Sequence, residues 1–379
     1  MPPGSTITDV AFYERAEMST SRIRRTREDW VNEVSQIAAP LLLGSIVAIA
    51  VILLNGGTPG MFFTALWKTI ASPNGFFQTM ASATALCLTA QCFIIGARCG
   101  VFNIGAEGAM FMGAAATLYV GAEWPMPWGL HLLAVMLVSM AAGALWLWPA
   151  SLLKTYRNVH EIVTTIMLNF IARFLLAFLI VWPLKDRFVD IGAFANEVLP
   201  TARFPVIAAP LTWAFLLAIL IAFATYVLLW FTRLGTHIRA AGANADAALG
   251  AGVNVRKLNA MSFFLGGAAA GLAGCVLTAG LPPSFTVNED LSALRNFGFL
   301  GISVALIARN HPLGAIFAAI FVATVRTSRF QFQKLGVAPE VTEIFIGAVI
   351  FAFAFPFVIQ SALGWLRARR KTLAEGHGA

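Results

Sequence analysis

The chain has 379 residues, of which 59% are hydrophobic and only 12% are charged, and its formal net charge is +8. A soluble domain of this length usually carries about twice that share of charged residues. The composition therefore excludes a separate soluble domain and predicts an all-α polytopic membrane protein.

Apolar runs of about 15 to 25 residues recur along the chain, close to the ~20 residues that a helix needs to cross a bilayer. We expect about ten transmembrane helices. Glycines four residues apart within these runs, such as Gly267 and Gly271, predict close helix packing. The expected spans are 35–54, 76–96, 104–121, 130–153, 161–182, 206–231, 259–281, 294–308, 312–327 and 342–361.

The basic residues indicate the orientation of these spans. With the N-terminus inside, 17 of the 26 Lys and Arg residues fall in inside segments, 6 in outside segments and 3 within spans. This asymmetry follows the positive-inside rule and places both termini in the cytoplasm. The charge thus reports orientation and not affinity for nucleic acid. We expect a basic cytoplasmic tail at 1–34, a transmembrane domain at 35–361 and a cytoplasmic tail at 362–379.

The spans 294–308 and 312–327 are short for a full crossing. They meet at the polar turn Arg309-Asn310-His311-Pro312, which contains a helix-stopping proline. Two interpretations remain open at this point: the two spans are tilted crossings, or they are half-helices that dip into the protein.

The segment GVFNIGAEG, residues 100–108, stands at the start of the third span. Asn103 can cap the following helix by accepting a backbone N–H bond. Glu107 is unusual, because a carboxylate so close to the bilayer is costly. It is either a first-turn acid that favours its own helix dipole or a paired or functional group.

A polar stripe runs along the fifth span, where Glu161, Thr165, Asn169 and Arg173 are spaced by four residues. Such a stripe cannot face lipid, because polar groups without partners are expensive there. It either bonds to neighbouring helices or lines a watery path.

Two other spans carry a polar face. In the second span, Gln91 lies seven residues from Thr84 and from Arg98. In the eighth span, Ser292, Arg295 and Phe299 share a helical face, with Asn296 beside them. Hydrogen-bonding groups next to aromatic rings suit a flat polar solute such as a nucleobase or a sugar. Most single Phe residues in a chain with 31 of them pack or face lipid instead.

Residues 232–258 form a polar, basic island between two apolar runs, and small residues fill its middle. Within it, Asp246-Ala247-Ala248 is followed by Gly252. The alanines allow a short helix to lie close against a cleft, and the glycine can end that helix in a left-handed turn. This segment is a candidate docking surface for another protein.

Motifs of enzymes are absent from the sequence. It contains no GxxxxGK followed by Ser or Thr, no GxSxG and no HExxH. We therefore expect no catalytic residues, no metal and no cofactor bound by this chain. If ATP drives the protein, another chain hydrolyses it.

Four blocks carry a resemblance to a known family: GVFNIGAEG, NVHEIVTTIMLNFIAR, GTHIRAAGANADAALGAGVNV and FGFLGISVALIARNHPLGAIFAA. They resemble signature stretches of permeases of the ribose, simple-sugar and nucleoside branch of bacterial ABC importers, in the same order between residues 36 and 360. NIGAEG and TTIMLN look most like nucleoside-uptake permeases, although Ala109 stands where such a permease is expected to have Gln. The stretch from Asp246 to Gly252 is similar to the ATPase-docking motif of ABC permeases.

The resemblance implies a multi-pass subunit of about ten helices in the bacterial inner membrane. It implies ABC ATPase subunits, a second homologous permease, a periplasmic or lipoprotein substrate-binding protein and membrane lipid as partners, with no nucleic acid. We expect an ATP-driven importer of nucleosides. The alternatives are a simple-sugar, ribose-like ABC permease and an ion-coupled secondary transporter that works alone.

Two sets of residues are expected to serve this function. The expected substrate-path residues are Gln91, Asn103, Glu107, Thr165, Asn169, Arg173, Arg295 and Asn296. The expected ATPase-coupling residues are Asp246, Ala247, Ala248 and Gly252. A permease dimer can instead place some of the path residues at subunit contacts.

Overall fold

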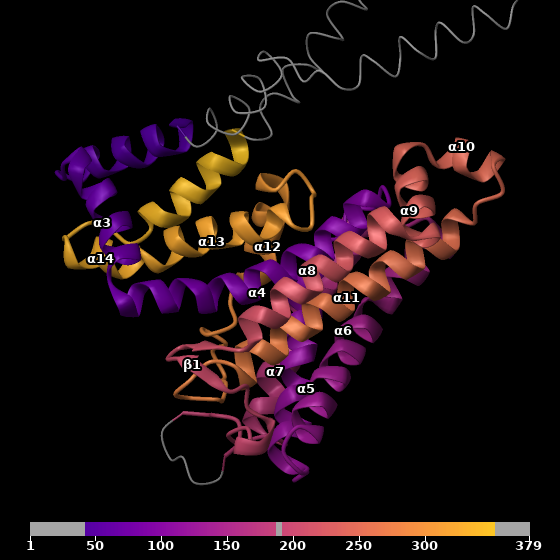
Figure 1. Ribbon diagram of the computed structural model, residues 1–379, viewed down its shortest axis with the longest axis horizontal. Coiled ribbons are helices and arrows are strands. Elements are labelled where there is room, and N and C mark those ends of the chain that lie inside the picture. The colour runs from indigo at the N-terminus through magenta and orange to yellow at the C-terminus, as the bar shows by residue number, and fades with distance from the viewer. Residues whose placement is uncertain (1–41, 187–191, 353–379) are drawn as a thin grey trace, which may run out of the picture. The chain divides into compact units, whose positions relative to one another are not determined.

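The computed structural model describes residues 42–186 and 192–352 (Figure 1). The expected tails at 1–34 and 362–379, and the outer parts of the first and last expected spans, lie outside these residues. The chain divides into two compact units, and residues 48–346 form the unit that contains the candidate site.

Each of the ten expected runs contains a helix in its described part, which confirms the all-α polytopic class. Five of the described helices are long and apolar enough to cross a membrane: α4 (Pro73–Arg98), α6 (Leu130–Arg157), α7 (Glu161–Val181), α8 (Ala214–Phe231) and α11 (Val255–Ala279). The helix Leu42–Leu54 and α3 (Pro59–Ala71) meet at a bend of 116° and can form one further, broken span. Two shorter apolar helices are α12 (Phe297–Ile307) and Val341–Ala352, and the bundle also contains α5 (Ala106–Glu123) and α13 (Gly314–Thr327).

One expected span starts too early. Residues 206–212 form a short antiparallel hairpin of β1 (Val206–Ala208) and β2 (Leu211–Thr212), and α8 begins only at Ala214. Pro205 and Pro210 flank β1, and each lacks the N–H that a helix interior requires. The apolar residues of this segment therefore belong to a hairpin and not to the first two turns of a transmembrane helix.

The bundle has two ends that we name by their elements (Figure 1). The hairpin end carries the β-hairpin and η1 (Pro200–Ala202), where the Leu199 N–H donates to the Gly121 carbonyl at 2.8 Å. The α10 end carries α9 (Arg233–Ala243) and α10 (Ala245–Gly250), which follow α8. A short helix, α14 (Arg329–Lys334), follows α13.

The helices α5, α6 and α11 cross at glycines. A methyl group added at Gly271 would overlap the Ser139 carbonyl oxygen, and one at Gly113 would overlap the Gly271 backbone. Likewise, Gly143 and Gly267 face each other across α6 and α11. The three backbones are therefore in direct contact, and the close packing predicted from the spacing of Gly267 and Gly271 is confirmed.

The helix α12 is a half-helix that starts inside the bundle. Its 11 residues span about 16 Å, roughly half of a bilayer's apolar thickness. At its start, the Thr89 hydroxyl, more than two turns before the end of α4, donates to the Phe297 carbonyl at 3.0 Å. Beyond its other end, Arg98 Nε donates to the Asn310 carbonyl at 2.8 Å. These contacts favour the half-helix over the tilted crossing.

The expected span 294–308 begins too early, because α12 starts only at Phe297. Residues 282–296 are irregular and connect the hairpin end, where the Ala195 N–H donates to the Val287 carbonyl at 3.0 Å, with the start of α12. Asn296 has a left-handed φ of +67°. Ser292 and Arg295 therefore do not share a helical face with Phe299, because helical spacing does not apply before Phe297.

We expect Gly271→Ala to lower the Tm of the purified protein in detergent by several degrees, because the added methyl group forces two helices apart. Overpacking of this kind costs ~1–3 kcal/mol. The matched control is Gly60→Ala in α3, where an added methyl group meets nothing within 4 Å. Equal Tm values for the two variants would show that the glycine contact does not limit stability.

Candidate functional site

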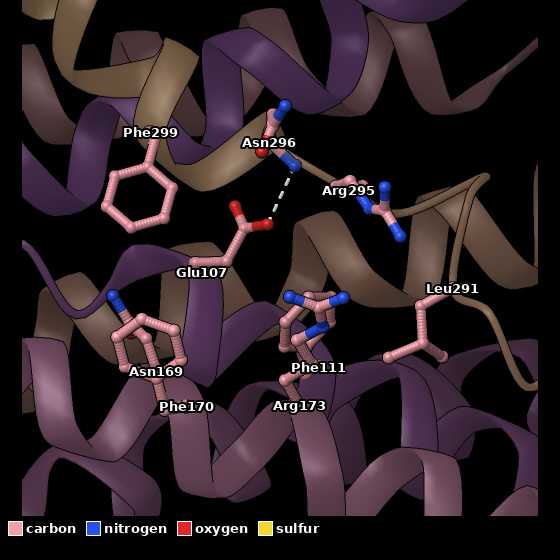
Figure 2. Close-up of a pocket in the computed structure, with 9 residues that line it drawn as sticks. All are labelled: Glu107, Phe111, Asn169, Phe170, Arg173, Leu291, Arg295, Asn296 and Phe299. Atoms are coloured by element: carbon pink, nitrogen blue, oxygen red, sulfur yellow. Dashed lines mark hydrogen bonds between the residues drawn. The ribbon is translucent and has the colours of Figure 1, made fainter.

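A cavity of about 130 Å³ lies where α5, α7 and the first turn of α12 meet (Figure 2). Nine residues line it: Glu107, Phe111, Asn169, Phe170, Arg173, Leu291, Arg295, Asn296 and Phe299. Five of the eight expected path residues are among them. The structure thus brings together side chains from three parts of the chain, and the first and last of these parts are about 180 residues apart in sequence.

Glu107 caps the buried start of α12. Its carboxylate accepts the Asn296 N–H at 2.8 Å and the Gly298 N–H at 2.5 Å, and the residue is only 4% exposed. The first N–H groups of a helix have no partner within the helix, and they carry the positive end of its dipole. The carboxylate therefore serves a helix 189 residues away in sequence, in addition to lying in the first turn of α5.

Gly298 makes this cap possible. A methyl group at position 298 would overlap the backbone of Glu107, so only a glycine allows α12 to approach α5 so closely.

Asn169 joins α7 to the start of α5. Its Oδ1 accepts the Gly108 N–H at 2.8 Å, and its Nδ2 donates to the Ile104 carbonyl at 2.9 Å. Both ends of the amide are therefore occupied by backbone groups. Asn169 borders the cavity, but its hydrogen bonds attach α7 to α5 and leave no amide group for a solute.

The polar stripe predicted on α7 is confirmed, and its members differ in what they contact. At the α10 end, Glu161 pairs with Lys154 at 2.8 Å and accepts the Phe102 N–H at 3.3 Å. Asn169 holds α5, as described above. Arg173, one turn further on, is exposed at the cavity. Glu161 and Asn169 thus bond to neighbouring segments, and Arg173 lines the cavity at the far end of the stripe.

The cationic side chains at the cavity differ in their bonding. Within residues 42–186 and 192–352, no hydrogen bond or ion pair occupies the Arg173 guanidinium. Arg295 Nη2 makes one long hydrogen bond, at 3.4 Å, to the Asp290 carbonyl. The Ser292 N–H donates to the Asp290 carboxylate and lowers the pKa of that group, so Asp290 is charged at neutral pH.

Three expected path residues lie elsewhere. Gln91, Asn103 and Thr165 are fully buried and do not line the cavity. Gln91 Nε2 donates to the Pro312 carbonyl at 3.3 Å, and the Thr165 hydroxyl donates to the Glu161 carbonyl at 2.8 Å. Asn103 Oδ1 accepts the Gly105 N–H at 2.9 Å. This bond stabilises the loop before α5, and the expected cap on the first turn of α5 is not formed.

Three of the lining residues were not expected from the sequence, and Phe299 was expected near the path but not as a member of it. Phe111 lies four residues after Glu107, so the helical period of α5 places both on one face. Phe170 directly follows Asn169. Leu291 lies in the irregular segment 282–296, where no periodicity could have indicated it.

An aromatic cluster connects the α10 end with the turn after α12. The Arg98 guanidinium lies 5.1 Å from the ring of Trp230, and the Arg239 guanidinium lies 5.6 Å from it. His311 lies 5.2 Å from the same ring, and Arg98 also donates to the Asn310 carbonyl.

Burial, and to a smaller extent the Arg98 charge, lower the pKa of His311. Its neutral Nδ1 accepts the Gly314 N–H at 3.2 Å.

The helix α10 presents a small exposed surface. The Asn244 side chain caps its start by accepting the Ala247 N–H at 3.0 Å. Asp246 and Ala247 are exposed, whereas Ala248 is buried. Gly252 has a φ of +81°, which confirms the predicted left-handed turn after this helix.

Glu107→Ala should lower the Tm of the protein in detergent, because it leaves the buried Gly298 N–H and the partly buried Asn296 N–H without an acceptor. Each such group costs ~1–3 kcal/mol. Glu107→Gln keeps one acceptor oxygen and should lower the Tm less. The control is Glu123→Ala, an exposed carboxylate at the other end of α5. If both alanine variants melt at the wild-type temperature, the cap does not stabilise α12.

Comparison with known proteins gives the family. The family model described as "Branched-chain amino acid transport system / permease component" matches residues 75–354. The guanosine ABC transporter permease protein NupP of Bacillus subtilis is 30% identical over 89% of this chain and 98% of its own length. The nucleoside ABC transporter permease protein NupB of Lactococcus lactis is 28% identical over 88% and 94%, respectively.

A third relative transports a different solute by name. The glucose ABC transporter permease protein TsgB13 of Haloferax volcanii is 27% identical over 86% of this chain and 88% of its own length. No solved structure matches the chain. The apolar helices show a multi-pass membrane protein. Because the family model matches most of the chain, the chain belongs to the family of branched-chain amino acid transport system permease components.

Proposed function

We propose that this chain is the transmembrane permease subunit of an ATP-driven ABC importer that takes up nucleosides. The observation that carries the proposal is the cavity at the start of α12, where aromatic rings lie beside hydrogen-bond donors. Its relatives NupP and NupB, named as guanosine and nucleoside permeases, support the same solute class.

The chemistry of the cavity favours a neutral, flat solute. Phe111, Phe170 and Phe299 offer faces on which a heterocyclic base can stack, and Arg173 offers N–H donors. Broken helices of transporters often point their positive ends at anionic groups of the substrate. Here Glu107 already occupies that end of α12. The site therefore needs no carboxylate from the solute, which favours a nucleoside over an amino acid.

A simple sugar is the second candidate solute, because the relative TsgB13 is named as a glucose permease. A sugar would use the same donors but would gain less from three aromatic faces. An ion-coupled transporter is the third candidate and differs in its energy source.

In this proposal the solute passes along Glu107, Asn169, Arg173, Arg295 and Asn296, while Gln91, Asn103 and Thr165 support the path from behind. ABC ATPase subunits dock at Asp246, Ala247, Ala248 and Gly252 and hydrolyse the ATP, so this chain is a transport subunit with no cofactor of its own. A second homologous permease and a substrate-binding protein complete the importer in the bacterial cytoplasmic membrane.

Uptake by the reconstituted importer tests the proposal. The chain is co-expressed with the ATPase, second permease and binding protein encoded beside it, and uptake of labelled guanosine, uridine, ribose, glucose and leucine is measured in proteoliposomes with ATP inside. We expect uptake of nucleosides that requires ATP. Uptake of sugars alone would show that the solute is a sugar and not a nucleoside. Uptake driven by an ion gradient without ATP would contradict the assignment as an ABC importer.

We also expect Asp246→Lys to abolish co-purification of the ATPase, because the reversed charge lies on the exposed face of α10. The matched control is Glu289→Lys, another exposed acid in the segment between the hairpin end and α12. Both variants should reach the membrane in wild-type amounts. Retention of the ATPase by Asp246→Lys, or its loss in Glu289→Lys, would contradict the assignment of the docking surface.

A further inference from the structure

The polar groups around the cavity fall into two classes. The Glu107 carboxylate and both ends of the Asn169 amide are bonded to backbone groups of the cavity wall. Arg173 has no hydrogen bond or ion pair among the described residues, and its guanidinium points into the space between Glu107 and Leu291 (Figure 2). Of these three side chains, only Arg173 has all its hydrogen-bonding capacity left for a solute.

We propose that Arg173 is the residue that selects among solutes, by donating to a carbonyl oxygen of the base, and that Glu107 and Asn169 are positioning residues. This inference rests on the proposed function. It implies that the permease passes nucleosides with an oxo-substituted base, such as inosine or guanosine, faster than analogues that lack the oxo group.

The geometry of guanidinium fits this role. Its planar fork of N–H groups matches two neighbouring acceptors, such as O6 and N7 of an oxopurine. A lysine offers a point charge and no such fork. The proposal also explains why the cavity keeps an arginine without an ion-pair partner among the described residues: the solute supplies the acceptors.

The backbone at Arg173 is fixed in position, as a residue that distinguishes solutes requires. Asn169, one helical turn earlier, ties α7 to both Ile104 and Gly108. Phe170 lies on the adjacent turn of α7, and Phe111 stands on the facing helix (Figure 2). A base held between these rings would present its edge to the guanidinium. Arg295 is less suited, because it lies in the irregular segment before α12 and already donates to Asp290.

The test compares two solutes that differ at one edge of the base. Purine riboside has the ribose and ring system of inosine but lacks the 6-oxo group and the N1 proton. Uptake is measured in the complete importer at concentrations that saturate the binding protein, so that the rate reports passage through the permease. We expect the wild type to take up inosine about tenfold faster, the order of one hydrogen bond to a charged group.

The variants separate selection from positioning. Arg173→Gln should bring the inosine to purine riboside rate ratio close to one, and Arg173→Lys should give an intermediate ratio. Glu107→Gln and Asn169→Ala should slow both solutes and leave the ratio at its wild-type value. Assembly of each variant is checked by the ATPase that co-purifies with it, and Arg173→Lys serves where Arg173→Gln does not assemble.

Three outcomes would overturn the assignment of Arg173: a wild-type ratio near one, an unchanged ratio in both Arg173 variants, or uptake of inosine 5′-monophosphate, which would make the arginine a phosphate ligand. Absence of any nucleoside uptake by the wild-type importer would instead overturn the proposed function, so the two failures are distinguishable.

Discussion

The hydrogen bonds between the Glu107 carboxylate and the first N–H groups of α12 are the interaction on which the rest of the site depends. The first N–H groups of a helix have no partner within the helix, and each one left without an acceptor here would cost ~1–3 kcal/mol. Because the carboxylate satisfies them, α12 can be short and the irregular segment before it can reach deep into the protein. The cavity forms beside this junction.

Both ends of α12 are held by other parts of the chain. Glu107 binds its start, and Arg98 binds the turn after its end through the Asn310 carbonyl. Arg98 also lies over Trp230, which in turn faces Arg239 of α9. A continuous set of contacts therefore leads from the helix before α10, through an aromatic ring, to the half-helix at the cavity. In the proposed importer, these contacts connect the ATPase docking surface on α10 with the candidate path.

Local patterns predicted much of this structure, and long-range contacts decided the rest. Hydrophobic runs placed the helices, the four-residue spacing on α7 identified the side that faces protein, and the small residues before Gly252 indicated its left-handed turn. The start of α12 could not be found in this way, because it depends on a carboxylate 189 residues away. The same holds for Asn169: its spacing showed that it needed partners, but only the fold shows that those partners are backbone groups of α5.

The glycine crossing has a consequence for how such a protein can move. At Gly113, Gly143 and Gly271 the backbones of α5, α6 and α11 touch, and no side chain lies between them that could change rotamer. Packed elements of this kind do not deform gradually. The wall supplied by α7 is attached to α5 through the hydrogen bonds of the Asn169 side chain, which can exchange partners. In the proposed importer, α5 is therefore the fixed wall of the cavity, and α7 is the wall that an ATP-driven conformational change displaces.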